Sequence, residues 1–191
     1  MAHSRNKGRA FEQRIARDLR GWLGDEWAVE RNLNDDQSGK GGKRSGDLLV
    51  HSGPFDFPFK VECKFNDKLK PSHFWMQGGS KLLQDFWEQA DRQALSANKL
   101  PLLIANPAGP TMPVVCVVDL PAHSVLSSGA VNHDFGVELE MTLCGRRVVV
   151  SCWSDWLTMP PSALRELLPM EMGDPEMMAT EDAWFPVDGD Q

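Results

Sequence analysis

Two short, uninterrupted apolar runs near the middle of the chain constrain the fold more than any other feature. Their sequences are LPLLIA at 100–105 and PVVCVV at 113–118. Short continuous runs of this kind are typical of strands that are covered on both faces of a sheet. We therefore predict that both runs are buried central strands.

The flanking segments predict helices and further strands around these two runs. The first is a helix at 8–23, ended by Gly24-Asp25, whose apolar residues recur at helical spacing: Phe11, Ile15, Leu19, Trp22 and Leu23. The others are strands at 27–33, 47–51 and 58–65, a mostly helical stretch at 72–97 interrupted at Gly78-Gly79, a hairpin at 137–152 that turns at Cys144-Gly145, and a short helix at 161–168. This order predicts a mixed α/β sheet.

The net charge of −7 is distributed unevenly along the 191 residues. Residues 171–191 carry seven acidic side chains and no Lys or Arg, so residues 1–170 balance to zero. Within these, residues 1–20 hold six basic side chains against two acidic ones. Because nucleic acid is recognised by local basic patches, the overall negative charge does not exclude a DNA-binding protein.

Membrane and secretory classes find no support in the sequence. No apolar run approaches the roughly 20 residues that span a bilayer, and the polar, basic residues 1–9 lack the apolar stretch of a signal peptide. The four cysteines form no CxxC pair, which indicates free thiols in a reducing compartment: Cys63, Cys116, Cys144 and Cys152. We therefore expect a cytoplasmic protein with no membrane partner.

Glu62 and Lys64 are the centre of the candidate site. On a strand these two residues point to the same face, with Cys63 on the other face, in a segment that is otherwise apolar. An E-x-K triplet often arises by chance, so on its own an ion pair on a solvated strand is the simpler interpretation.

Asp47 strengthens the interpretation as a site. It opens the preceding predicted strand, directly after Ser45-Gly46, and a hairpin can bring it toward Glu62 and Lys64. Two carboxylates close together repel, and a divalent cation resolves that repulsion; hard oxygen ligands favour Mg²⁺ or Mn²⁺. Taken alone, Asp47 is also a common type of turn residue at a strand entry.

Glu12 is the third acidic candidate. Helical spacing places it in line with Ala16, Leu19 and Leu23, on the inward side of the first helix. A carboxylate there is costly unless it is paired or bound to a metal. The alternative is a glutamate at the edge of the apolar stripe that reaches water or meets an arginine.

Together these residue types predict a site for phosphodiester hydrolysis. That reaction needs a metal to activate water and to neutralise the charge that develops on the phosphate. Asp47, Glu62 and the backbone carbonyl of Cys63 would hold the metal. Lys64 would orient or help deprotonate the attacking water, and Glu12 would bind a water on the metal or a second metal.

The surrounding sequence resembles the PD-(D/E)xK nucleases, and among them the archaeal and phage-encoded Holliday junction resolvases. The run Arg5-Asn6-Lys7-Gly8, followed by Phe11-Glu12, is similar to their basic segment before a helix with a catalytic glutamate. The segments 45–47 (SGD) and 61–64 (VECK) match the later G-D and E-x-K positions. With a helix at 86–90 and a strand at 101–105, the resemblance covers residues 4–105.

The resemblance implies a restriction-endonuclease-like mixed sheet flanked by helices, Mg²⁺ dependence and a homodimer, with Glu12, Asp47, Glu62 and Lys64 as catalytic residues. The sequence departs from the family in having Gly46 in place of a proline, a long glycine-rich loop at 34–46 and no counterpart for residues 106–191. We predict a nuclease domain at 1–169, with a core at 4–118, an extension at 119–169 that contains an extra β-hairpin, and a disordered acidic tail at 170–191.

DNA is the expected partner, either branched or duplex. The side chains expected to contact it are basic: Arg5, Lys7, Arg9, Lys40, Lys43, Arg44 and Lys68. Gln89 and Gln93 could face the site from the helix that follows the catalytic hairpin.

The expected function is that of a structure-selective DNA endonuclease similar to a Holliday junction resolvase, phage-encoded and acting in the bacterial cytoplasm. One alternative is a restriction, host-DNA-degrading or repair nuclease of the same fold. The other alternative is a catalytically silent DNA-binding module.

Overall fold

The computed structural model describes residues 2–32, 47–75, 78–107, 114–129 and 139–167. The expectations of a mobile loop at 34–46 and of a disordered tail at 170–191 lie outside these residues. None of the helices in the described part of the chain combines the length and the hydrophobicity that crossing a membrane requires.

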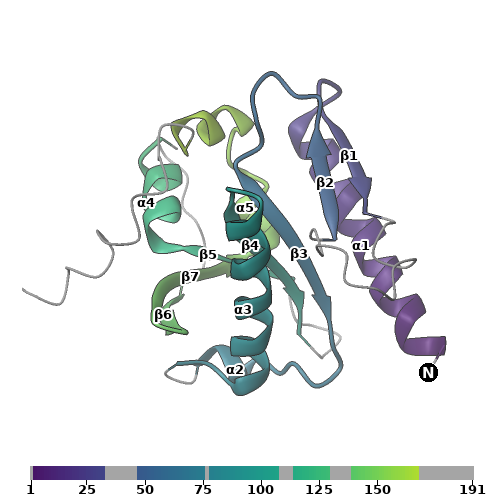
Figure 1. Cartoon of the computed structure of the whole chain (residues 1–191), viewed down its shortest axis with the longest axis vertical. Helices are drawn as coiled ribbons and strands as arrows, with labels where there is room; N and C mark the ends of the chain where they lie inside the picture. The colour runs from purple at the N-terminus through teal and green to yellow at the C-terminus, as the bar shows by residue number, and fades with distance from the viewer. Residues whose placement is uncertain (1, 33–46, 76–77, 108–113, 130–138, 168–191) are drawn as a thin grey trace, which may run out of the picture.

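In the described part of the chain, seven strands form one mixed sheet (Figure 1). Within it, β3 and β4 pair in parallel, and every other neighbouring pair is antiparallel. The predicted α/β class and its mixed sheet are thereby confirmed. In spatial order the strands are β1 (Ala28–Arg31), β2 (Leu48–His51), β3 (Phe59–Phe65), β4 (Leu100–Asn106), β5 (Val115–Asp119), β7 (Arg146–Cys152) and β6 (Leu139–Leu143).

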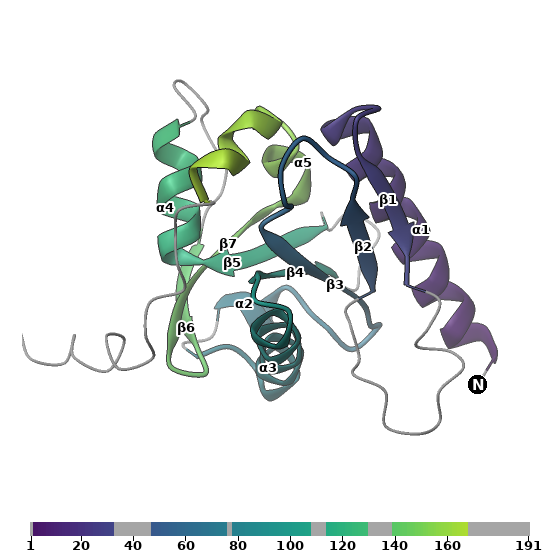
Figure 2. The ribbon, with the colours of Figure 1, turned by 45° about the horizontal axis from the view of Figure 1, so that its top comes forward.

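Helices cover both faces of this sheet, which completes the restriction-endonuclease-like arrangement. One face carries α3 (Lys81–Ser96), with the short α2 (Ser72–Trp75) before it in the chain (Figure 2). The opposite face carries four elements: α1 (Ala2–Leu23), α4 (Leu120–Gly129), α5 (Trp153–Trp156) and the 3₁₀ helix η2 (Pro161–Leu167).

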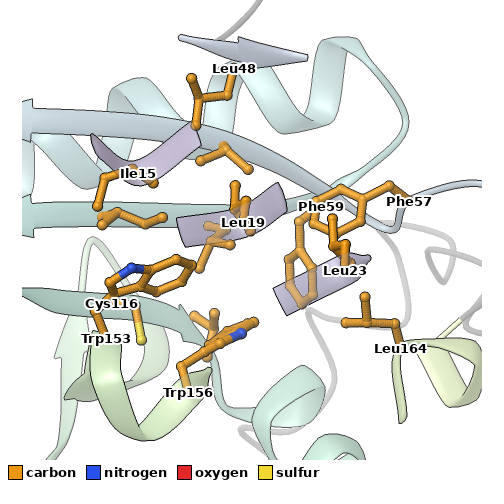
Figure 3. Packing of buried hydrophobic residues seen from close by; sticks show 14 of the residues in the cluster. Ile15, Leu19, Leu23, Leu48, Phe57, Phe59, Cys116, Trp153, Trp156 and Leu164 are labelled. Atoms are coloured by element: carbon orange, nitrogen blue, oxygen red, sulfur yellow. The ribbon is translucent and has the colours of Figure 1, made fainter. Parts of the chain in front are cut away.

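The hydrophobic core is divided by the sheet into two clusters. On the larger side, the apolar stripe of α1 packs onto the sheet and onto Trp153 and Trp156 of α5 (Figure 3). On the smaller side, Leu83, Trp87 and Ala90 of α3 pack against Leu103 and Val117. The predicted central strands are buried almost throughout, because each lies between these two layers. Residues of the larger cluster include Ile15, Leu19, Leu23, Leu48, Phe59, Trp153 and Trp156.

The first helix is longer than the predicted segment 8–23, since it begins at Ala2. Its early turns carry no apolar stripe, so the periodicity that indicates a helix begins only at Phe11. The helix ends as predicted: Gly24 adopts φ +84°, and its N–H donates to the carbonyl of Arg20 at 3.0 Å.

The C-terminal hairpin is confirmed but belongs to the main sheet. Its turn lies at Cys144-Gly145, with φ values of +52° and +81°, the geometry of a tight hairpin turn. Because residues 148–152 of β7 pair with β5, the hairpin extends the central sheet. The helix α4 was not predicted; its Pro121, in the first turn, is a start signal.

Candidate active site

Glu62 lies in the middle of β3 and faces α3. It stands opposite Leu103 in the parallel register, and Leu103 belongs to the cluster beneath α3. Its neighbours Val61 and Cys63 point into the cluster on the α1 side. The alternation predicted for this strand therefore holds, and it places a carboxylate that is only 1% exposed under a helix.

Two donors converge on one oxygen of Glu62. The ammonium of Lys64 contacts Oε1, and Nε2 of Gln89 donates to the same atom at 2.6 Å. The Lys64 ammonium also lies 5.6 Å from the ring centroid of Phe86 on α3. Of the two predicted glutamines, Gln89 thus reaches the site, whereas Gln93 lies one turn further along α3, 5% exposed, with no hydrogen-bond partner for Oε1 among the described residues.

Asp47 lies between β1 and β3, at the entry to β2, and the backbone holds it in place. Its N–H donates to the carbonyl of Val61 at 3.1 Å, and its carbonyl accepts from Asn32 at 2.9 Å. The side chain is fixed as well, because Oδ2 accepts from the N–H of Cys63 at 2.7 Å. Asp47 and Glu62 are therefore joined through one residue of β3, as the hairpin argument predicts.

The backbone carbonyl of Cys63 points to the same side as Asp47. In a strand, the N–H and C=O of one residue face the same neighbouring strand, and the N–H of Cys63 points at Asp47. Within the described residues, β2 pairs with β3 only at Leu48 and Val61, so the ladder has ended before Cys63. We call the place where β2 and β3 separate, with Asp47, Glu62 and Cys63 around it, the fork. There the Cys63 carbonyl lies beside two carboxylates.

The electrostatics of the fork disfavour two negative charges. Burial, followed by the charge of Glu62, raises the pKa of Asp47 from 3.8 to about 7, against the opposing effects of the Cys63 N–H and Lys64. Burial also raises the pKa of the Cys63 thiol well above its usual value, with Asp47 and Glu62 adding to the effect. The thiol is therefore neutral at physiological pH, and the charge of Glu62 disfavours ionisation of Asp47.

The donor set fits a hard divalent cation. Two carboxylates and a carbonyl offer only oxygen, which Mg²⁺ and Mn²⁺ prefer, and Mg²⁺ commonly binds one or two carboxylates while keeping several waters. Across the described ranges, no three His, Cys, Asp or Glu side chains come close enough to share one ion. Asp47, Glu62 and the Cys63 carbonyl are the residues that could hold the cation.

Glu12 forms an ion pair with Arg31, a residue that was not among the predicted site residues. Nε of Arg31 donates to Oε2 of Glu12 at 2.6 Å, and Nη2 lies 2.5 Å from the same oxygen. Glu12 is 21% and Arg31 15% exposed, so the pair lies half-buried between α1 and the end of β1. Of the interpretations considered for Glu12, an arginine pair is the one found here, and no sequence signal distinguished Arg31 from the other arginines.

Of the predicted DNA-contacting residues, the structure describes the side chains of Lys7, Arg9 and Lys68, and all three are exposed. Lys7 pairs with Asp67 at 3.2 Å and lies 5.8 Å from the ring centroid of Phe65, which brings the basic start of α1 to the end of β3. The side chain of Arg5 and the residues Lys40, Lys43 and Arg44 lie outside the described part.

A comparison with protein families agrees with this geometry. The family described as "Phage putative PDDEXK endonuclease" matches residues 3–159, which include all four acidic and basic site candidates and extend through the hairpin. Neither a curated protein nor a solved structure gives a significant match. The match spans most of the chain, and the protein therefore belongs to this phage PD-(D/E)xK endonuclease family.

Proposed function

We propose that the protein is an endodeoxyribonuclease that uses Mg²⁺ or Mn²⁺ to hydrolyse phosphodiester bonds. A single observation carries the proposal: the side chain of Asp47 is tied to the Cys63 N–H beside the buried Glu62, whose Oε1 contacts Lys64 and Gln89. Burial and the charge of the neighbouring Glu62 disfavour ionisation of Asp47, and a divalent cation held by the two carboxylates would offset that effect.

Each residue has a distinct role in this proposal. Asp47, Glu62 and the Cys63 carbonyl hold the cation, which supplies charge neutralisation on the phosphate and activation of water when bound. Lys64 lies next to Glu62 and orients the attacking water, because its ammonium can donate to water and phosphate oxygens while it contacts the carboxylate. Gln89 fixes the rotamer of Glu62 through its hydrogen bond.

The substrate we propose is branched DNA, as for a Holliday junction resolvase, with a homodimer as the acting form. Lys7, Arg9 and Lys68 lie exposed on the segments that flank the fork, where they can contact backbone phosphates. A resolvase cuts two strands of one junction, which requires two active sites. The resemblance of residues 4–105 supports this choice over a duplex-degrading nuclease.

The test is cleavage by the full chain of a substrate panel: a four-way junction, a flap, a linear duplex and a single strand, each with Mg²⁺, Mn²⁺ or a chelator. We expect metal-dependent cuts, most efficient on the junction. Glu62→Gln should abolish cleavage, whereas the matched control Glu140→Gln, at an exposed glutamate of β6, should cut like the wild type.

Equal cutting of duplex and junction would indicate a restriction or host-DNA-degrading nuclease and not a resolvase. Absence of cleavage on every substrate, together with DNA binding that is indifferent to metal and to Glu62→Gln, would identify a silent binding module and overturn the proposal.

A further inference from the structure

The ion pair between Glu12 and Arg31 bears on how many cations the site can hold. Nε of Arg31 donates to Oε2 of Glu12, and Nη2 lies 2.5 Å from the same oxygen. The guanidinium is permanently charged, so it neutralises this carboxylate at every physiological pH. Two nitrogens of one planar group therefore lie close to a single oxygen of Glu12.

The pair lies at the same end of the sheet as the fork. Arg31 is the last residue of β1 and stands opposite Leu48 in the register, while the N–H of Asn32 donates to the carbonyl of Asp47. The ring of Phe11 lies 6.1 Å from that of Phe65, which brings α1 to the end of β3. The charge of Glu12 contributes to the raised pKa of Asp47, in keeping with this proximity.

Two roles are open to a third carboxylate at such a site: direct ligand of a second cation, or acceptor for a water molecule. The first role would bring a dication next to the guanidinium, which repels it. It would also require Glu12 to leave Arg31, and the half-buried guanidinium would then lack its counter-charge. The second role uses Oε1 and leaves the ion pair intact.

We propose that Arg31 is a positioning residue that holds Glu12 as an acceptor for a water molecule in the site and thereby limits the site to one divalent cation. This inference rests on the proposed function, because it assumes that Asp47 and Glu62 bind the first cation.

The test counts Mn²⁺ ions bound by the chelator-treated full chain without DNA, by electron paramagnetic resonance of free Mn²⁺ and by calorimetry. We expect one Mn²⁺ per wild-type chain and a second one in Arg31→Met, where Glu12 loses its counter-charge. Arg31→Lys should retain one, and so should the double variant Arg31→Met/Glu12→Gln. Arg147→Met, which removes the exposed cross-strand partner of Glu140, is the matched control and should retain one.

A second variant keeps the inference testable if Arg31→Met does not fold. Glu12→Gln alone should bind one Mn²⁺ with an affinity within about threefold of the wild type. The reason is that Glu12 would accept a hydrogen bond from a water molecule and would not bind the ion directly. A loss of about tenfold or more in that variant, two Mn²⁺ in the wild type, or a folded Arg31→Met with one Mn²⁺ would overturn the inference.

Failure of the proposed function gives a different result. In that case the wild-type chain binds no Mn²⁺, or Glu62→Gln binds it as the wild type does. Those results would show that Asp47 and Glu62 do not form a cation site, and both the proposed function and this inference would then be wrong.

Discussion

Two pairs of acids lie at the central sheet, and the charges around each pair differ. On the hairpin side, Arg146 bridges Asp119 of β5 at 3.1 Å and Asp91 of α3 at 3.2 Å. Burial raises the pKa of Asp119, and Arg146 is the largest influence that lowers it again. At the fork, the largest influence after burial is the charge of Glu62, which raises the pKa of Asp47 further.

The comparison separates a structural ion cluster from a binding site. In the Arg146 cluster one guanidinium contacts both carboxylates, although burial keeps the pKa of Asp119 above its usual value. At the fork, the Lys64 ammonium contacts Glu62, whereas no cationic side chain among the described residues forms an ion pair with Asp47. Acids with perturbed pKa values are typical of functional sites.

The largest expected effect contrasts one aspartate from each group. Asp47→Asn should lower the rate of metal-dependent DNA cleavage by at least about 10³-fold, equivalent to about 4 kcal/mol of barrier, because it removes a proposed metal ligand. Asp119→Asn should stay within about twofold of the wild type. Single-turnover cleavage rates measure both, and equal losses in the two variants would remove the distinction between the groups.

A smaller loss is expected at Gln89, which positions Glu62 without touching the substrate. Gln89→Met should reduce cleavage or Mn²⁺ affinity by about 10–100-fold, the usual effect of removing an outer hydrogen bond to a metal ligand. Gln84→Met is the matched control on the same helix, because Gln84 donates to the carbonyl of Gly78 and not to an acid of the fork. If the two variants behave alike, the Glu62 contact has no positioning role.

Loss of Arg146 should lower the stability of the fold and leave DNA cleavage unchanged. Arg146→Met leaves Asp119 and Asp91 without their cation, and we expect a loss of about 1–2 kcal/mol, reduced by the partial exposure of Arg146. Added Mg²⁺ should not restore this loss beyond its effect on the wild type. Thermal unfolding with and without Mg²⁺ measures both quantities, and selective rescue by Mg²⁺ would mean that this cluster also binds cations.

The smallest effect concerns pH. The pKa of Asp47 is about 7 in the folded chain, against an ordinary value of 3.8, so folding favours the protonated carboxyl. The stability that this carboxyl contributes is complete below pH 3.8 and is lost as the pH rises through 7. Asp47→Asn carries no such charge, so without metal its Tm should exceed that of the wild type by about 3 °C or more at pH 8.

At pH 4 this advantage of Asp47→Asn should vanish, since the wild-type carboxyl is then largely protonated. Asp25→Asn, at an exposed aspartate just after α1, is the control and should show no such pH dependence. A Tm advantage that is constant between pH 4 and pH 8 would contradict the raised pKa.

The local pattern of apolar and polar residues was sufficient to predict most of the sheet and the side-by-side placement of Glu62 and Lys64 in the candidate site. Strand alternation placed Glu62 and Lys64 on one face, and the continuous apolar runs marked β4 and β5. These features depend on neighbours along the chain, which a single sequence displays directly.

The parts that escaped prediction depend on contacts distant in sequence. Arg31 reaches Glu12 only because β1 packs beside α1, and the β7–β5 pairing that draws the hairpin into the sheet joins segments separated by α4. The early turns of α1 carry no apolar stripe that could indicate a helix. No periodicity encodes such relations.

The most direct test of the central claim is a crystal structure of the chain grown with Mn²⁺, in which anomalous scattering locates the ion. The account predicts a Mn²⁺ peak in the fork, about 2.1 Å from a carboxylate oxygen of Asp47 and one of Glu62, with the Cys63 carbonyl beside it. A fork without a peak at saturating Mn²⁺, or a peak bound by Asp119 and Asp91 instead, would contradict it.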